Sequence, residues 1–393
     1  MEQNWKSNII LFLTSQTISL FGSSLVQYAI MWYITLQTQS GIMMTIFIIC
    51  GFLPTFLLSP FAGVWADRYN RKILILSSDS FIAAATLLLA VLFIMGYQEL
   101  WLLFTISAIR GLGAAVQMPA VGAFLPQMVP ADKLMKVNGI NSSIQSMIML
   151  VSPVASGALL TFASIQTIFF IDVTTATIAV LTLLIFLHVP VHAKALEKQK
   201  VSYFGDLLEG FRYIKHHEYV RNFFIFCGLF FVMAAPMAFL TPLQVARSFG
   251  NDVWRLTAIE ITFSAGMMAG GLLMASWDGF RNKIHTMIMA GLIMGIATIA
   301  LGVIPIFWLY CFFMAAVGFS IPNFNTPSTV LLQQKVEEEF LGRVFGVLTM
   351  ISSSMMPLGM LIFGPLSDFI RIEWMLIVTG ILMIFVTIFS SWK

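Results

Sequence analysis

The sequence predicts an all-α membrane protein of twelve transmembrane helices, arranged as two bundles of six. Its 393 residues are 59 % hydrophobic and 10 % charged, whereas an average soluble domain is about 25 % charged. The long apolar stretches are continuous rather than alternating, which favours helices over a β-barrel. Most stretches reach the ~20 residues that a helix needs to cross a bilayer. The helices are expected at about residues 9–35, 43–66, 73–95, 100–121, 138–161, 166–188, 221–246, 256–277, 284–304, 306–330, 343–364 and 373–391.

The distribution of basic residues fixes the expected orientation of these helices. Of the 21 Lys and Arg residues, seventeen fall in the gaps on one side of the membrane, and the other side holds only Arg247, Arg255 and Arg371. The positive-inside rule places the crowded side, with both chain termini, in the cytoplasm. The net charge of +3 reflects this topology, and no soluble basic patch indicates nucleic-acid binding.

A charged central segment divides the chain into an N-terminal six-helix bundle (1–190), a central cytoplasmic loop (191–220) and a C-terminal six-helix bundle (221–393). Apolar residues recur at helical spacing in this loop, which favours an amphipathic surface helix, with a solvated linker as the alternative. The halves resemble each other weakly. Val129 and Val336, like Gly157 and Gly364, are separated by 207 residues. Parallel six-helix repeats are the internal symmetry of one large transporter class.

The loop between the second and third helices reads Gly63-Val-Trp-Ala-Asp-Arg-Tyr-Asn-Arg-Lys72. It resembles the signature loop of the major facilitator superfamily, with Asn70 where glycine is usual. Gly63 would let a neighbouring helix approach closely, and Asp67 would accept hydrogen bonds from the N-terminus of helix eleven. The resemblance implies that this contact helps to hold an outward-facing state; a cytoplasmic anchor is the alternative. The candidate gating residues are Gly63, Asp67, Arg68, Arg71, Lys72, Gly342 and Arg343.

Two intramembrane stretches extend this resemblance. Ile109–Ala115 resembles the second motif of the superfamily, and its Arg110 lies mid-helix. A charge there costs at least ~2.5 kcal/mol, so Arg110 should face a cavity or a partner. In helix five, Ser152, Pro153 and Gly157 resemble a shortened antiporter motif. The alternative for this motif is a proline kink packed through small residues.

Further stretches look like bacterial macrolide-efflux permeases of this superfamily, among them Gln16–Leu20, Gln27–Tyr33, Glu260–Gly266 and Phe340–Phe345. This resemblance implies a secondary active transporter in the inner (cell) membrane of a bacterium. It would export a bulky amphipathic, macrolide-like drug or metabolite, by proton antiport and alternating access. Export of a siderophore, peptide or lipid is the alternative within the class. A non-transporting receptor or scaffold is the alternative from another class, although a scaffold has no need of charges in lipid.

Antiport needs a group that binds and releases a proton, and three intramembrane carboxylates are candidates: Asp79, Asp172 and Glu260. Each could instead form a structural pair or lie at the interface. Polar residues at helical spacing on helix one predict that it lines a wet cavity, whereas those on helix five (Asn138, Asn141, Gln145) are expected to pack between helices. The candidate cavity or substrate contacts are Arg110, Gln16, Gln27, Gln117, Asn323, Phe230 and Met233.

Nothing in the sequence points to catalysis, a cofactor or a metal site, so we expect no enzyme activity. No Walker-type nucleotide-binding loop occurs, so ATP is not expected as the direct energy source. The three cysteines all fall in predicted helices and are expected to be unpaired. The expected partners are a small-molecule substrate, protons and the lipid bilayer, and the protein is expected to be a monomer.

Overall fold

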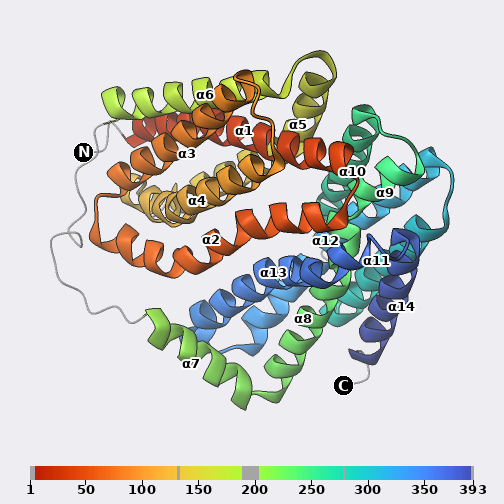
Figure 1. Cartoon of the computed structure of the whole chain (residues 1–393). Coiled ribbons are helices and arrows are strands. Elements are labelled where there is room, and N and C mark those ends of the chain that lie inside the picture. Colours follow the sequence, from red (N-terminus) through yellow and green to blue (C-terminus); the bar gives the residue numbers. More distant parts are fainter. Residues whose placement is uncertain (1–4, 131–132, 188–202, 278, 391–393) are drawn as a thin grey trace. The chain divides into compact units, whose positions relative to one another are not determined.

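The computed structural model describes residues 5–130, 133–187, 203–277 and 279–390, and every regular element in this part is an α-helix (Figure 1). Twelve candidate membrane spans occur there, which confirms the predicted fold class. The helices that contain them are α1 (Trp5–Thr38), α2 (Gly41–Arg68), α3 (Arg71–Ile94), α4 (Leu100–Met128), α5 (Leu134–Phe162), α6 (Ile165–Phe186), α8 (Glu218–Phe239) together with α9 (Thr241–Ser248), α10 (Val253–Trp277), α11 (Lys283–Val303), α12 (Phe307–Lys335), α13 (Glu338–Leu366) and α14 (Ile372–Ser390).

Several helices are longer than the sequence predicts. Helix α4 ends at Met128 rather than near residue 121, and α13 begins at Glu338 rather than near 343. Hydropathy locates the hydrocarbon region, whereas a helix continues into the headgroup layer for as long as its backbone hydrogen bonds do. The expected seventh span is also interrupted, because α8 ends at Phe239 and α9 (Thr241–Ser248) follows it with Pro242 in its first turn. Proline has no N–H to donate at that point.

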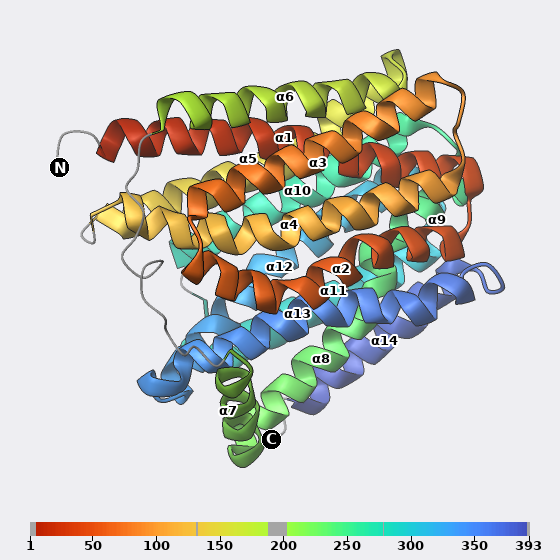
Figure 2. The ribbon, with the colours of Figure 1, turned by 60° about the vertical axis from the view of Figure 1, so that its left-hand side comes forward.

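The chain forms two compact units. The first unit contains residues 1–34 and 46–201, and the second contains residues 35–45 and 202–393. In the first unit α3 packs on both α4 and α6, and Figures 1 and 2 both show α1, α3 and α6 side by side. In the second unit α11 packs on α12 and α14, and α8 packs on α13.

The second unit also contains an amphipathic helix in the segment that joins the two bundles. Helix α7 (Tyr203–His216) packs on α13, which agrees with the surface-helix interpretation of the described part of the segment. Tyr213 stacks on Phe340 of α13 with ring centroids 4.6 Å apart. The remainder of the central segment, 188–202, lies outside the described residues.

Helices α10 and α12 of the second unit are held together by close backbone contact. A Cβ atom added to Gly266 would lie 2.0 Å from the carbonyl oxygen of Ala315, and one added to Gly318 would lie 2.0 Å from that of Phe263. Only glycine allows this approach, which is the usual way for helices to pack in lipid.

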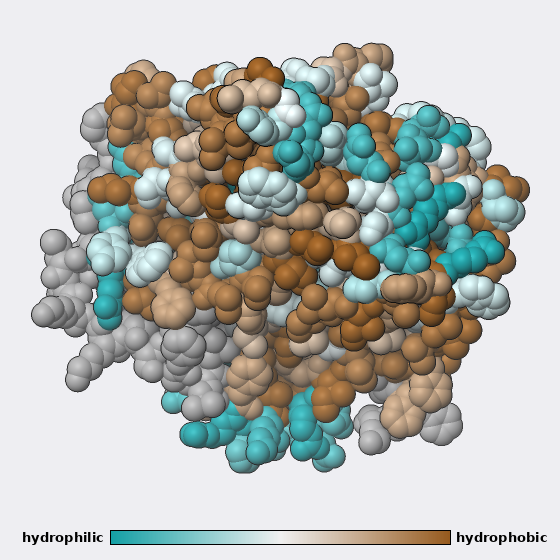
Figure 3. Space-filling view, in the orientation of Figure 1, coloured by the Kyte–Doolittle hydropathy of each residue, from teal (hydrophilic) through white to brown (hydrophobic). Residues whose placement is uncertain are grey.

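Apolar side chains cover much of the surface. Figure 3 shows them over most of the face in view, and large apolar residues of α6 such as Leu184 and Phe186 are 56 % and 64 % exposed. Soluble monomeric proteins rarely expose so large an apolar area to water. The surface is therefore suited to lipid.

Candidate functional site

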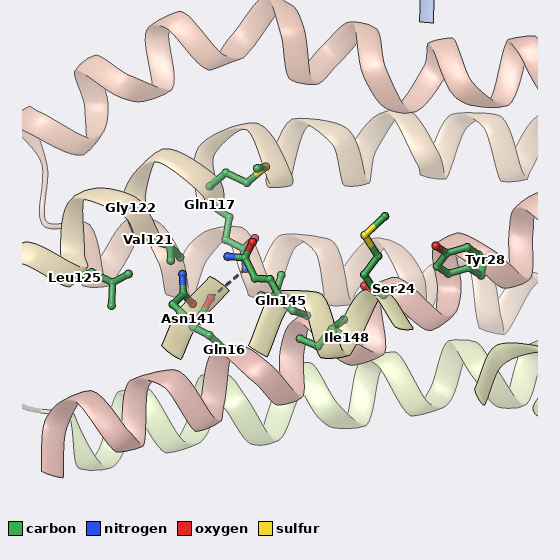
Figure 4. A pocket seen from close by; sticks show the side chains of 13 residues that line it. Gln16, Ser24, Tyr28, Gln117, Val121, Gly122, Leu125, Asn141, Gln145 and Ile148 are labelled. Atoms are coloured by element: carbon green, nitrogen blue, oxygen red, sulfur yellow. Dashed lines mark hydrogen bonds between the residues drawn. The ribbon is translucent and has the colours of Figure 1, made fainter. Parts of the chain in front are cut away.

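A cavity of about 370 Å³ lies within the first unit, between α1, α4 and α5 (Figure 4). Its polar lining consists of neutral groups, chiefly four side-chain amides, and no charged side chain occurs among the described lining residues. Its apolar lining is aliphatic and methionine-rich, which suits a bulky apolar solute. The lining residues are Gln16, Leu20, Ser24, Tyr28, Gln117, Met118, Val121, Gly122, Leu125, Asn141, Gln145, Ile148 and Met149.

One buried carboxylate lies directly behind this wall. Asp79 of α3 is only 2 % exposed and is not itself part of the lining. The side-chain nitrogen of Gln117 donates to its Oδ1 over 2.7 Å, and that of Gln16 donates to its Oδ2 over 3.3 Å. Both glutamines line the cavity, and the Gln117 nitrogen also lies 3.4 Å from the Gln16 side-chain oxygen (Figure 4). The hydroxyl of Ser19 on α1 also hydrogen-bonds Asp79 but does not line the cavity. Asp79 therefore contacts the cavity through two neutral amides.

The second buried carboxylate of this unit has a cationic partner. Asp172 of α6 is completely buried, and its Oδ2 lies 2.6 Å from a guanidinium nitrogen of Arg110 on α4. Thr86 of α3 donates to Oδ2 over 2.9 Å, and Ser23 of α1 donates to Oδ1 over 3.2 Å. Arg110 also donates to the Thr86 hydroxyl and to the carbonyl oxygen of Ser23. The pair joins four helices.

The two carboxylates differ in what protonation would leave behind. A neutral Asp172 would leave the Arg110 charge without its counter-ion in a site that excludes water, which is strongly unfavourable. A neutral Asp79 would leave no charge uncompensated, and its new O–H could donate to an amide oxygen of either glutamine. Asp172 thus has a cationic partner, whereas the described partners of Asp79 are neutral.

Arg110 and Gln117 were both expected to contact the cavity or the substrate, and both point into the first unit. They serve different carboxylates, however, and Arg110 does not line the cavity. Gln27 is exposed and does not line it either. Conversely, Asn141 and Gln145 of α5 were expected to pack between helices and instead line the cavity. Periodicity identifies the polar face of a helix but not the neighbour that this face meets.

The described residues of the signature loop act mainly on helix ends. Arg71 donates to the carbonyl oxygen of Ala66 over 2.8 Å and to that of Ala123 over 2.9 Å. Lys72 donates to the carbonyl oxygens of Leu187 and Leu184 over 2.6 and 3.3 Å. The C-terminal turns of α2, α4 and α6 thus receive donors from cationic side chains, as their dipoles favour.

Asn70, which stands where glycine is usual, caps α3 by accepting from the backbone N–H of Lys72 over 3.0 Å. Arg68 is exposed, and a Cβ at Gly63 would meet no atom within 4 Å. The surroundings of Asp67 and Gly342 lie outside what the structure describes.

Arg343, the last candidate gating residue, binds within the second unit. Its guanidinium lies 3.0 Å from a carboxylate oxygen of Glu209 on α7. This ion pair and the stacking of Tyr213 on Phe340 attach α7 to the first turns of α13.

The antiporter-like motif lies in the interior of α5. Ser152 is fully buried, its hydroxyl has no hydrogen-bond partner among the described residues, and Pro153 lies within the helix. The adjacent Ser156 donates to the carbonyl oxygen of Leu25 over 3.1 Å, and the Gly157 carbonyl accepts from Thr161. The motif therefore attaches α5 to α1.

The candidates of the second unit lie in helices α8, α10 and α12. Phe230 is buried and stacks on Phe324 with centroids 4.8 Å apart, and Met233 is half-buried one turn further on. Asn323 is buried and donates to the Phe319 carbonyl, while its oxygen has no partner in the described part of the chain. Glu260 is partly buried in α10, and no hydrogen bond or ion pair joins it to a described residue.

A fourth acidic site, Asp368, was missed by the sequence interpretation. It follows α13 in the second unit and accepts from the backbone N–H groups of Gly41 and Ile42, over 2.7 and 3.0 Å, and from the Ser40 hydroxyl over 2.7 Å. Arg247 lies 2.8 Å from it. Burial by itself raises the pKa of Asp368, but these donors outweigh it and hold the pKa below its usual value. No local pattern around Asp368 signals this cap, because its partners are about 120 and 330 residues away.

The comparisons with known proteins agree with this architecture. A family profile described as Major Facilitator Superfamily matches residues 12–360. Macrolide efflux protein A of Streptococcus pyogenes is 29 % identical over 98 % of this chain and 95 % of its own length. The protein of the same name from Enterococcus faecalis is 30 % identical over 79 % of this chain and 96 % of its own.

A solved structure shows the same fold at low identity. A bacterial homologue of the human lysosomal transporter Spinster, in an inward-facing and unoccupied conformation, matches with a TM-score of 0.74 and 13 % identity, over 99 % of this chain and 97 % of that one. Taken with the matching profile and the twelve spans, this identifies the chain as a multi-pass membrane transporter that belongs to the major facilitator superfamily.

Proposed function

We propose that this transporter exports a bulky amphipathic molecule of the macrolide type, by proton antiport, from the cytoplasm. The relatives named for macrolide efflux support the substrate class. The positive-inside distribution supports cytoplasmic termini. Six-helix halves that rock about a midplane site would give alternating access, and we expect the protein to work as a monomer.

The cavity of the first unit supports an amphipathic substrate. Its volume lies within the range of small-molecule sites, about 300–1,000 Å³. Methionine and aliphatic side chains such as Met118, Met149 and Leu20 would contact an apolar ring, and the amides would bind its polar substituents. The described lining residues include no cation that would offer a counter-charge to an anionic solute, which makes an acidic siderophore or an anionic lipid the less favoured alternative.

The observation that carries the antiport proposal is the position of Asp79. It is a buried carboxylate with two amide donors, a hydroxyl donor (Ser19) and no described cation, one side chain behind the cavity wall. A group that can be charged or neutral in the same site can bind a proton on one side of the membrane and release it on the other. Asp172 is compensated by Arg110, so we assign it a structural role. Glu260 remains the second candidate for proton coupling, in the other unit.

Transport by purified protein in liposomes tests this proposal. Uptake of radiolabelled erythromycin into inside-out-oriented proteoliposomes would be measured under an imposed pH gradient, an imposed voltage, both and neither. We expect accumulation driven by the pH gradient and abolished by an ionophore that collapses it. Accumulation that is independent of the pH gradient would refute proton antiport. No accumulation of erythromycin, together with gradient-driven transport of an anionic siderophore or a lysophospholipid, would refute the substrate assignment.

A further inference from the structure

We propose that Gln16 and Gln117 form an amide relay, which converts the protonation state of Asp79 into a change in the hydrogen-bonding groups that face the cavity. This inference rests on the proton antiport proposed above and assigns a positioning role to the two glutamines. It also defines the chemistry of the substrate: the transported form must present hydrogen-bond donors, such as an ammonium group or hydroxyls.

The first step concerns the ionised state. A carboxylate only accepts hydrogen bonds, so the amide nitrogens of both glutamines must point toward Asp79, as they do at 2.7 and 3.3 Å. The amide oxygens are then left for other partners. The Gln16 oxygen lies at the edge of hydrogen-bonding distance from the Gln117 nitrogen, at 3.4 Å, and the Gln117 oxygen accepts from no described residue. Both residues line the cavity (Figure 4), which therefore offers acceptors while Asp79 is charged.

The second step concerns the protonated state. A neutral carboxyl carries one O–H donor, which needs an acceptor in a site that water does not reach. The amide oxygens of the two glutamines and the Ser19 hydroxyl can serve as this acceptor, and of these groups only the amides belong to the cavity lining. If an amide turns its oxygen to Asp79, it turns its NH₂ group away from Asp79 and toward the cavity. The terminal torsion of glutamine is broad and roughly two-fold, so this rotation needs no backbone movement.

The third step is the consequence for a ligand. A ligand with donor groups binds the acceptors that the cavity offers when Asp79 is ionised, and it meets donors when Asp79 is protonated. Proton and ligand therefore exclude each other, although Asp79 never touches the ligand. This is the sign of coupling that an antiporter requires.

The charged surroundings of Asp79 fit this role. Helix α6 contributes Asp172 and helix α4 contributes Arg110, and these two compensate each other at 2.6 Å. Helix α1 contributes Gln16 and no charged side chain near Asp79. The one described cation of α1, Lys6, lies ten residues before Gln16 in the sequence. Among the described hydrogen-bond partners of Asp79, the two amides also line the cavity, whereas the Ser19 hydroxyl does not.

The test measures how binding depends on pH. Equilibrium binding of erythromycin to purified full-length protein would be followed over a series of pH values below neutrality, where the aliphatic amine of the ligand stays protonated. For the wild type we expect affinity to fall about five- to tenfold as Asp79 becomes protonated, the effect of reversing one or two hydrogen bonds. In Gln16→Met/Gln117→Met, which has side chains of similar size without amides, affinity should no longer depend on pH.

The matched control is Gln145→Met. Gln145 lines the same cavity and makes no hydrogen bond to Asp79, so this variant should bind more weakly but keep the wild-type pH dependence. If the double variant does not fold, the single variant Gln117→Met removes the shorter contact and should at least halve the pH-dependent change in affinity. Asp79→Asn should bind with an affinity that is constant across the series.

The possible outcomes separate the relay from the function. If wild-type affinity varies with pH and the glutamine variants retain that variation in full, the relay is wrong and antiport stands. If wild-type affinity does not vary with pH, proton antiport is wrong and the relay fails with it. If Gln145→Met loses the pH dependence as completely as the glutamine pair does, the effect belongs to the cavity as a whole, and the relay is again refuted.

Discussion

Asp79 and Asp172 are equally buried in the first unit but differ in their partners. They are 2 % and 0 % exposed, and each is hydrogen-bonded from two other helices or more. Asp172 faces the guanidinium of Arg110, and Asp79 faces two amides and a hydroxyl, all neutral groups. Burial alone would mark both as proton sites. The comparison indicates that the hydrogen-bonding partner determines whether a buried carboxylate suits proton binding. Protonation is favourable only where it leaves no buried opposite charge without its counter-ion.

The same difference predicts opposite responses to mutation. A buried ion pair is strongly destabilised when one member is removed, because the other remains charged and unsolvated. Removing one member of an amide network leaves no charge without its counter-ion. Hydrogen bonds between helices in lipid contribute only ~0.6 kcal/mol each on average. Mutations at the Asp172 site should therefore act on stability, and mutations at the Asp79 site should act on coupling.

The largest expected effect is that of Arg110→Met. Methionine fills much of the volume of arginine but leaves Asp172 as an unpaired buried carboxylate. We expect the free energy of unfolding, measured by SDS titration in mixed micelles, to fall by about 3–5 kcal/mol. Asp172→Asn should also destabilise, because it leaves the Arg110 charge without its counter-ion.

The control for this prediction removes both charges. Arg110→Met/Asp172→Leu has no ion to strand, so it should recover most of the stability that Arg110→Met loses. If the double variant is no more stable than Arg110→Met, the loss comes from packing rather than from the unpaired charge. The contrast between the two carboxylates would then lack its energetic basis.

The sequence predicts the fold of this chain far better than it predicts its site. Twelve apolar stretches and the bias of the basic residues are one-dimensional signals, because the bilayer selects for each helix separately. The break between α8 and α9 was not predicted, although Pro242 is a local signal that could have revealed it. Arg110 was correctly expected to face a partner or a cavity, since a charge in lipid must do so.

The assignment of partners could not be predicted, because it depends on how helices far apart in sequence meet. Asp79, Asp172 and Glu260 are equivalent as intramembrane carboxylates in the sequence, and only the fold pairs Asp172 with Arg110, 62 residues away. The same limit explains the wrong expectation for Asn141 and Gln145, which were expected to pack against other helices. Their spacing shows which face of α5 is polar, and the structure shows that this face borders a cavity.

A third carboxylate, Asp368, is expected to have an intermediate effect on stability when it is mutated. Asp368 combines an arginine partner with backbone donors at the start of α2, and its side chain is 19 % exposed. Removing a charge from a helix N-terminus typically costs ~0.3–2 kcal/mol, so Asp368→Asn should reduce the free energy of unfolding by about 1–2 kcal/mol at neutral pH.

The pH dependence of this effect has a defined sign. The pKa of Asp368 is lowered in the folded protein, so its contribution to stability is complete above the ordinary aspartate value of about 3.9. That contribution is lost as the pH falls through the lower folded value. The difference between wild type and Asp368→Asn should therefore be constant from pH 7 down to about 5 and disappear in stronger acid. A difference that grows on acidification would contradict the assignment of Asp368 as an ionised cap.

The smallest expected effect on stability, and the largest on transport, is that of Asp79→Asn. Asparagine keeps an oxygen that can accept from Gln117 and gains an NH₂ group that can donate to the Gln16 oxygen, so unfolding should change by less than about 1 kcal/mol. It cannot bind or release a proton near neutral pH. We therefore expect export against a concentration gradient to be abolished in liposomes, while equilibrium binding of erythromycin remains measurable. Glu260→Gln, assayed in parallel, decides between the two proposed coupling residues. If Asp79→Asn retains gradient-driven export and Glu260→Gln loses it, the proton site is Glu260 in the second unit. Asp79 would then have a structural role in the first unit and no role in proton coupling.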